Sequence, residues 1–204
     1  MKNVLLFLFV LLFVACGQPT AESEKEAEND SLRTTAATEK DYSYLDNEIA
    51  QLDDNVKIRK YWEAMERLDK KYRQEEPVIL QQKGYNSKEY QDLKKNMQEA
   101  DAENIAKAER MLAKHGFPLR DSFGPLASNG AYLVVLHAPT YEQQSKNFKY
   151  LYDAYQKGGL MEGPFSFYLN QMYDLKMGKM YEVSGSFREE DRINGIIEEL
   201  GLLE

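Results

Sequence analysis

The sequence predicts an all-α protein, a compact multi-helix domain that follows an N-terminal secretion signal and a polar tether. From residue 56 onward, apolar residues recur every three or four positions with charged residues between them, which is the pattern of amphipathic helices. Ser, Thr, Asn and Pro stand where these patterns begin, and Gly stands where they end. Residues 179–186 interrupt the pattern, so one short extended turn or hairpin is expected there. The fourteen tyrosines add the aromatic area that a packed core needs.

Residues 1–15 are expected to be a lipoprotein signal peptide. An apolar run of eleven residues, Val4 to Val14, would span only about 17 Å as a helix, roughly half of a bilayer core. That length is typical of a secretion signal rather than of a membrane span. The ending "FVAC", which closes on Cys16, resembles the lipobox of bacterial lipoproteins. The resemblance implies cleavage before Cys16 and lipidation of its thiol, which would anchor the chain to the inner or outer membrane of the cell envelope. The alternative is an ordinary cleaved signal with a chance cysteine beside the cut.

Residues 16–40 are expected to form a flexible acidic tether. They contain almost no large apolar residue, so they cannot bury enough surface to offset the entropy lost on ordering. The formal charge of the chain is −8, and such a chain lacks the basic footprint that binds phosphate backbones or anionic headgroups. Nucleic acid is therefore not expected as a partner, and membrane attachment is expected to run through lipid on Cys16. Since Cys16 is the sole cysteine, no internal disulfide is possible.

One helical domain, residues 41–204, is expected to follow the tether. The apolar stripe of its first helix comprises Val56, Tyr61, Trp62, Met65, Leu68 and Tyr72. The second helix is predicted to begin at Asn86, because Asn86 and Glu89 have capping-box spacing, and to end at Gly116 after a basic last turn. Its apolar face comprises Tyr90, Leu93, Met97, Ile105, Ala108, Met111 and Leu112.

The stretch "ASNGAYLVVLHAP" is the most apolar part of the domain. Pro118, Gly124 and Pro125 mark a loop before it, and a proline suits the first turn of a helix, so a helix is predicted from Pro125 to His137. Residues 132–136 fit a buried strand equally well, because periodicity does not separate the two at this length. Gly130 favours the helix reading, since a glycine inside a helix costs about 1 kcal/mol and usually permits close backbone contact.

Three further helices are expected in the C-terminal part of the chain. The first begins at the capping box of Thr140 and Gln143 and runs to about Lys157. The second begins at Pro164 and ends at Gly178. The third is capped by Ser186 and continues through residue 200.

The stretch "HGFPLRDSFGPLASNGAYLVVLHA" resembles the bacterial domain of unknown function 6624, so the chain is identified as a lipoprotein-anchored member of that family. The likeness covers about residues 60–202 and implies a mostly helical domain, with no activity attached to it. The matching positions are Gly116, Phe117, Pro118, Gly124, Ala127, Ser128, His137 and Ala138. Upstream, the family pattern of an aspartate followed closely by an arginine, and later an aspartate with an asparagine three residues on, is matched by Asp69, Arg73, Asp101 and Asn104.

The sequence departs from the family pattern at two places. Phe117 stands where the family usually has tryptophan. After the tyrosine-leucine pair the family usually has aspartate-arginine, and here Asn170 and Gln171 follow. If these positions belong to the family's site, this chain has lost charge there. The resemblance therefore implies that Asp69, Arg73, Asn104, Ser128, Asn170 and Gln171 are binding-site candidates.

His137 and Asp101 are the candidate catalytic residues. Asp101 and Asn104 fall on the inward stripe of their helix, where a carboxylate needs a cation or several donors, and Arg73 is one candidate partner. In the functional interpretation, His137 is a general base oriented by Asp101. In the structural interpretation, which we favour, His137 is a helix-end residue tied into an internal polar cluster, because buried polar groups are normally satisfied by structural partners.

Other chemistries have weaker support. The chain has two histidines and lacks HExxH or CxxC spacing, so neither a metal nor a cofactor is expected, and a mixed site of histidine and carboxylate is the alternative. Ser128 lacks the G-x-S-x-G elbow of serine hydrolases, and close helix packing explains a small residue there.

Three functions compete on these observations. The first, which we favour, is a non-catalytic envelope lipoprotein that binds a protein or a small molecule. The second is a hydrolase or transferase that uses His137 with Asp101. The third is a small immunity-type or stress lipoprotein that blocks a partner by surface contact.

Overall fold

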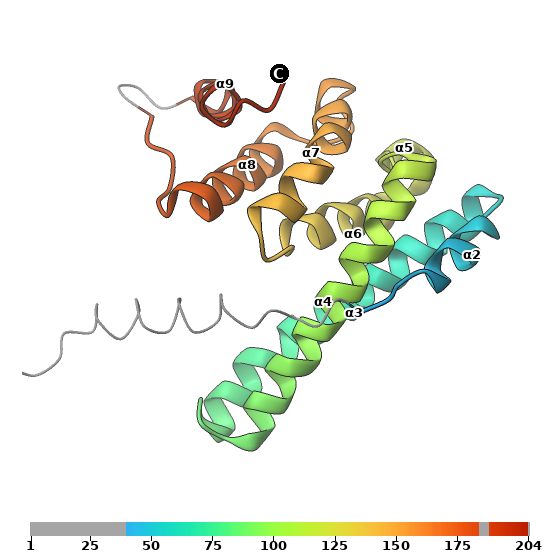
Figure 1. The fold of residues 1–204 in the computed structure, drawn as a ribbon, viewed down its shortest axis with the longest axis vertical. Coiled ribbons are helices and arrows are strands. Elements are labelled where there is room, and N and C mark those ends of the chain that lie inside the picture. Colours follow the sequence, from blue (N-terminus) through green and yellow to red (C-terminus); the bar gives the residue numbers. More distant parts are fainter. Residues whose placement is uncertain (1–39, 184–187, 204) are drawn as a thin grey trace, which may run out of the picture. The chain divides into compact units, whose positions relative to one another are not determined.

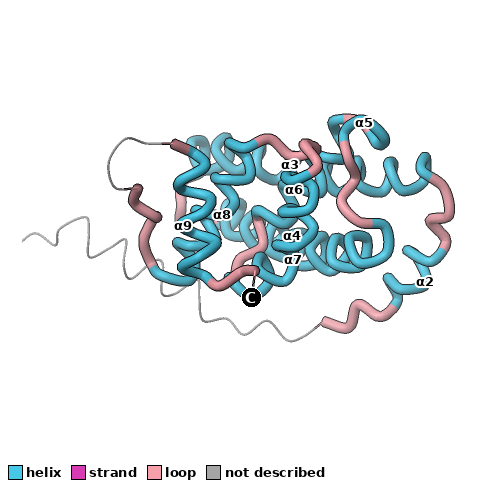
Figure 2. Tube along the Cα trace, turned by 90° about the horizontal axis from the view of Figure 1, so that it is seen from above, coloured by secondary structure: helices cyan, strands magenta, loops and turns pink. Residues whose placement is uncertain are grey.

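The computed structural model describes residues 40–183 and 188–203, and within these ranges the chain forms helices and no strand (Figures 1 and 2). The all-α class predicted from the sequence is confirmed. The expected signal peptide, Cys16 and the tether lie outside the described residues. The helices are α2 (Tyr44–Ala50), α3 (Asn55–Lys83), α4 (Lys88–His115), α5 (Arg120–Phe123), α6 (Pro125–Leu136), α7 (Tyr141–Gln156), α8 (Glu162–Met177) and α9 (Glu189–Leu200).

A long hairpin of α3 and α4 supports one side of the domain, and α6 packs against both of its helices (Figure 1). Gly130 makes this packing possible. A Cβ atom at Gly130 would stand 2.7 Å from the Trp62 carbonyl oxygen and 2.9 Å from the Glu66 Cβ, so only glycine lets the two backbones approach this closely. The close contact expected at Gly130 is therefore present. Trp62 is completely buried beneath it.

Helices α7, α8 and α9 form the other side, and α8 packs against both α7 and α9 (Figure 1). Phe165 and Tyr168 of α8 are fully buried, and the Tyr155 and Phe165 rings stack with centroids 4.6 Å apart. The Tyr168 hydroxyl donates a hydrogen bond of 2.7 Å to the Gln144 carbonyl, which joins α8 to α7. Burial raises the pKa of Tyr168, so its hydroxyl keeps the proton that this bond requires.

Several predicted helix boundaries are confirmed. The apolar stretch is the helix α6, with Pro125 at its start and His137 as its C-cap, so the strand alternative is wrong. The Thr140 side chain accepts a hydrogen bond from the Gln143 amide at the start of α7. Gly178 ends α8 with φ 71°, a left-handed conformation that side chains disfavour. The predicted apolar face of α4 is buried along its whole length.

Other boundaries differ from the prediction. Ser87 rather than Asn86 caps α4, because its side chain accepts from the Tyr90 amide. The helix α8 begins at Glu162, so Pro164 lies within its first turn. The N-cap of α9 is Arg188, and Ser186 lies outside the described residues. The first predicted helix extends through Pro77 to Lys83.

Three local features were not anticipated. The loop expected before α6 contains the single turn α5, and a further short helix, α2, precedes α3. Val56 is 50% exposed and Ile58 takes its place in the core. Both short helices have too few residues for an apolar period to show in the sequence.

Residues 180–183 carry the non-helical turn expected near 179–186, and the remainder of that segment lies outside the described ranges. Asn170 holds this turn. Its side-chain oxygen accepts from the Tyr181 amide at 2.8 Å, and its amide nitrogen lies 3.5 Å from the Met180 sulfur. Among the described residues, no helix has the length and apolar character needed to cross a membrane.

Candidate functional site

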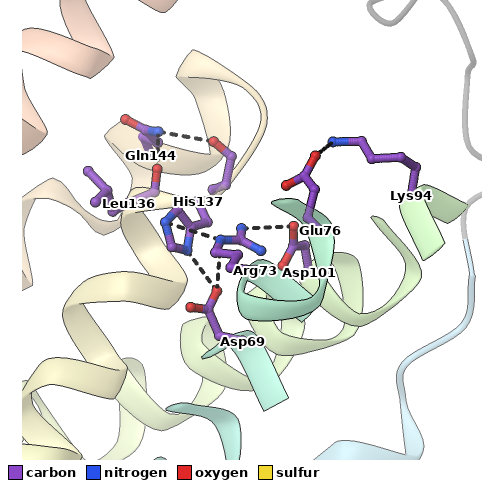
Figure 3. A network of polar contacts seen from close by, with 9 residues as sticks. Asp69, Arg73, Glu76, Lys94, Asp101, Leu136, His137 and Gln144 are labelled. Atoms are coloured by element: carbon purple, nitrogen blue, oxygen red, sulfur yellow. Dashed lines mark hydrogen bonds and ion pairs between the residues drawn. The ribbon is translucent and has the colours of Figure 1, made fainter. Parts of the chain in front are cut away.

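A network of four charged or titratable side chains lies where the C-terminal end of α6 meets α3 and α4 (Figure 3). His137 Nδ1 lies 2.7 Å from Asp69 Oδ1, and Arg73 Nε donates to His137 Nε2 at 3.3 Å. Arg73 Nε also lies 3.5 Å from Asp69 Oδ1. The side chains of Asp69 and Arg73 share a face of α3 because four residues separate them, close to one helical turn.

Arg73 extends the network to the neighbouring helix α4. Its Nη2 donates to Asp101 Oδ2 at 3.1 Å, so the pairing expected between Arg73 and Asp101 is present. The side chains of Arg73 and Asp101 are only 26% and 19% exposed, which strengthens their attraction relative to a pair in open water. The buried Nη1 of Arg73 has no hydrogen-bond partner among the described residues.

Burial is the largest influence on Asp101. It raises the pKa of the carboxyl above its ordinary value, because a carboxylate loses hydration there, and the hydrogen bond and charge of Arg73 oppose this only in part. Asp69 adds to the upward shift by like-charge repulsion. Arg73 therefore compensates two carboxylates at once.

The partners of His137 indicate which ring nitrogen donates and which accepts. A carboxylate only accepts and a guanidinium only donates. Nδ1 therefore donates to Asp69, and Nε2 accepts the Arg73 hydrogen. Both ring nitrogens are thus hydrogen-bonded inside the protein.

The backbone around His137 is fixed by Gln144, which is completely buried. Its side-chain amide donates to the carbonyl oxygens of Leu136 and Ala138, at 2.9 and 3.0 Å, on either side of His137 (Figure 3). These carbonyls lie at the end of α6, where no further helical turn supplies donors. Gln144 thereby holds the turn that aims the imidazole at α3.

The partner of His137 differs from the one expected. Asp69, not Asp101, is hydrogen-bonded to the imidazole, and Asp101 is reached through Arg73. A signal for this was present in the sequence. Asp69 follows Trp62 and Met65 on the buried stripe of α3 and is itself only 3% exposed. A carboxylate on such a stripe needs a buried partner.

The other binding candidates do not join this network. Asn104 lies one turn beyond Asp101, is 2% exposed, and has no hydrogen-bond partner for either amide atom in the described part of the chain. Asn170 is occupied with the turn at residues 180–181, and the Gln171 side-chain oxygen is buried without a described partner. Ser128 stands near the opposite end of α6 from His137.

At that opposite end, the surface is hollowed. A cavity of about 680 Å³ lies between α5, the first turns of α6 and the turn that joins α7 to α8, and Ser128 and Tyr132 line it. None of Asp69, Arg73, Asp101 and His137 lines this cavity. The chemistry-bearing cluster and the hollow are thus two separate features. Within residues 40–183 and 188–203, no group of three His, Cys, Asp or Glu side chains has the arrangement of a metal site.

Comparison of the chain with family models, with curated proteins and with solved structures finds no match.

Proposed function

We propose that this chain is a lipid-anchored envelope protein whose helical domain binds a small molecule or a protein without catalysing a reaction. The network of Asp69, Arg73, Asp101 and His137 then serves to hold α3, α4 and α6 in register. The anchor is proposed from the lipobox at Cys16, and membership of the domain of unknown function 6624 family from the motif that ends at His137 and Ala138.

The observation that carries this proposal is the full use of the His137 ring. A general base needs a free lone pair within reach of the proton that it abstracts. Here Nε2 already accepts from Arg73, and Nδ1 already donates to Asp69. Removing a proton from a substrate would require Arg73 to leave a position that two carboxylates stabilise.

A second candidate function is a hydrolase or transferase. The bond of 2.7 Å between His137 and Asp69 favours it, because a carboxylate on Nδ1 is how many enzymes orient a catalytic imidazole. In this case His137 is the base, Asp69 replaces Asp101 as the orienting carboxylate, and Arg73 moves to hold an anionic substrate group.

The substitution His137→Asn separates the two functions. The asparagine amide can still donate to Asp69 from near the position of Nδ1, but it cannot accept a proton from a substrate. For a binding protein, we expect the variant to fold and to rescue a strain from which the gene is deleted. Loss of rescue with an unchanged circular dichroism spectrum and melting temperature would instead support the enzyme.

Cys16→Ser tests the anchor. We expect the wild-type chain to incorporate radiolabelled palmitate and to sediment with membranes, and the variant to do neither. Palmitate incorporation by the variant would contradict lipidation at Cys16.

A further inference from the structure

The hollow at the start of α6 has the dimensions of a ligand site. Its volume of about 680 Å³ falls within the range of roughly 300–1,000 Å³ that is usual for pockets that hold small molecules. Apolar side chains form much of its wall, and two of them, Leu126 and Met161, remain 47% and 67% exposed. A ligand with an apolar body would cover this surface.

The Ser128 side chain is a polar group in the hollow that has no hydrogen-bond partner among the described residues. The residue is only 8% exposed and lines the cavity, yet its hydroxyl forms no hydrogen bond with any described residue. The hydroxyl oxygen of Ser128, unlike that of Ser166, is not sealed from solvent, so it can pair with water or with a ligand in the hollow. The Ser128 side chain is therefore available to a ligand from within the domain.

Two helices begin at the same hollow with no side chain as their cap. Pro125 and Leu126 of α6 and Pro164 of α8 line it, and neither Gly124 nor Met161, the N-caps, supplies a side-chain hydrogen bond. Side chains cap α3, α4 and α7, whereas α2, α5 and α9 also lack a side-chain cap. Pro125 and Pro164 have no amide hydrogen, so an anion here would be favoured by the remaining unpaired amides of the two first turns and by the partial positive charge of each helix start.

Two of the residues that line the hollow are positively charged, as are the partial charges at the helix starts. Arg120 and Lys157 line the hollow and take part in no ion pair among the residues that the structure describes. Asp121 is the one carboxylate among the lining residues. In a chain with a formal charge of −8, a hollow with two unpaired cations and one carboxylate is a local exception.

Tyr132 keeps the hollow in shape. Its hydroxyl donates to the Pro164 carbonyl at 2.9 Å, which ties α6 to the start of α8 across the cavity. Burial raises the pKa of Tyr132 to about 12, so the hydroxyl stays protonated and neutral. The part of α6 around Tyr132 is therefore tied to the first turn of α8 before any ligand arrives.

From these observations we propose that the hollow binds a small molecule with one anionic group, a carboxylate or a phosphate, on an apolar body. The anionic group meets Ser128, Arg120 and Lys157, and the apolar body covers Leu126 and Met161. The inference rests on the proposed binding function and names the chemical class of its ligand.

A matched pair of probes tests the class. The full chain, purified in non-ionic detergent micelles, is titrated by isothermal calorimetry with 4-phenylbutyrate and with 4-phenylbutan-1-ol, which differ only in the carboxylate. We expect saturable binding of the carboxylate that is about tenfold tighter than binding of the alcohol. Phenyl phosphate, titrated in parallel, distinguishes a preference for phosphate from one for carboxylate.

Two variants locate the binding. The double substitution Arg120→Ala with Lys157→Ala should weaken 4-phenylbutyrate about five- to tenfold, because two exposed cations are lost from the site. The double substitution Lys83→Ala with Lys95→Ala removes the same charge from exposed positions on the α3–α4 hairpin, and we expect it to leave the affinity unchanged. Asn129→Phe, at an exposed lining position, should block the probe by volume without disturbing the core.

Equal affinity for the alcohol, absence of saturable binding up to about 10 mM, or an affinity indifferent to Arg120 and Lys157 would each overturn the inference. These failures are distinct from failure of the proposed function. If the carboxylate does not bind while His137→Asn still rescues the deletion strain, the ligand class is wrong and the binding function stands. If rescue fails with the fold intact, the binding function is wrong whatever the probes do.

Discussion

The two ends of α6 differ in how their polar groups are used. At the C-terminal end, both ring nitrogens of His137 are hydrogen-bonded, to Asp69 and to Arg73, and the carbonyls beside it accept from Gln144 (Figure 3). The buried Nη1 of Arg73 and Oε1 of Gln144 have no partner among the described residues. At the N-terminal end, Ser128 has no described partner and the helix has no side-chain cap. One helix thus carries a closed network at one end and an open hollow at the other.

This difference bears on where function is sought. A histidine hydrogen-bonded to an aspartate is a common catalytic arrangement, yet both ring nitrogens of His137 already have hydrogen-bond partners in the protein. Polar groups that face a cavity without a partner in the protein are what a ligand can pair with, since no hydrogen bond within the protein has to break. We therefore assign stability to the closed end and binding to the open end.

The largest expected effect on stability comes from removing the Asp69 carboxylate from the network at the C-terminal end of α6. Asp69→Ala leaves the His137 hydrogen on Nδ1 without an acceptor and deprives Arg73 of one of its two carboxylates, so we expect a loss of about 3 kcal/mol in the free energy of unfolding. Urea denaturation measures it. Asp53→Ala, which breaks an exposed pair with Lys57, is the control and should cost less than about 1 kcal/mol. Equal losses from both substitutions would mean that the network does not hold the helices.

A smaller effect is expected at Gly130, midway along α6, where this helix contacts α3. A methyl group at Gly130 meets the Trp62 carbonyl and the Glu66 side chain, so Gly130→Ala should cost about 2 kcal/mol despite the better helix propensity of alanine. Gly163→Ala is a matched control, because its added methyl group meets nothing within 4 Å and gains helix propensity. Thermal unfolding of both variants should therefore shift in opposite directions. A stable Gly130→Ala protein would show that α3 and α6 can separate freely.

The smallest effect is expected at Asp101, and it depends on pH. Because burial raises the pKa of Asp101 in the folded state, the folded chain binds more protons than the unfolded chain in that pH range. The stabilising contribution is then present below the ordinary aspartate pKa of about 3.9 and is lost as pH rises through the raised value.

Asp101→Asn removes this titration. We expect the variant to be at least as stable as the wild type at pH 7, and the wild type to gain on it as pH falls toward 4, in urea denaturation across that range. A variant that is clearly less stable at pH 7 would mean that the ion pair with Arg73 outweighs the burial of Asp101.

Parts of the fold could be predicted from the sequence because their signals are local. Pro125 and the capping Thr140 fix helix starts within a few residues of themselves, and Gly178 ends a helix through its own backbone conformation. Neighbouring capping residues are harder to separate. Asn86 and Ser87 both suit an N-cap, and the difference between them depends on the turn that precedes α4.

For the candidate site, the sequence predicted which residues take part but not all of the pairs that they form. The sequence paired Arg73 with Asp101 as one candidate, since Asp101 stood on an inward helix face and Arg73 lies one residue past the apolar face of its own helix, and the structure contains this pair. It did not assign Asp69 to His137, because two carboxylates on two helices are equivalent until the helices are packed.

Capping residues and the apolar period act over a few residues, so the amino-acid sequence was enough for the helical class of the domain and for most limits of its helices. The pairing of His137 with Asp69, 68 residues away, and the common hollow at the starts of α6 and α8 arise only when the helices pack together. Both depend on how closely α6 approaches its neighbours. That distance is set by side-chain volumes on separate helices, and at its tightest point by the missing side chain of Gly130.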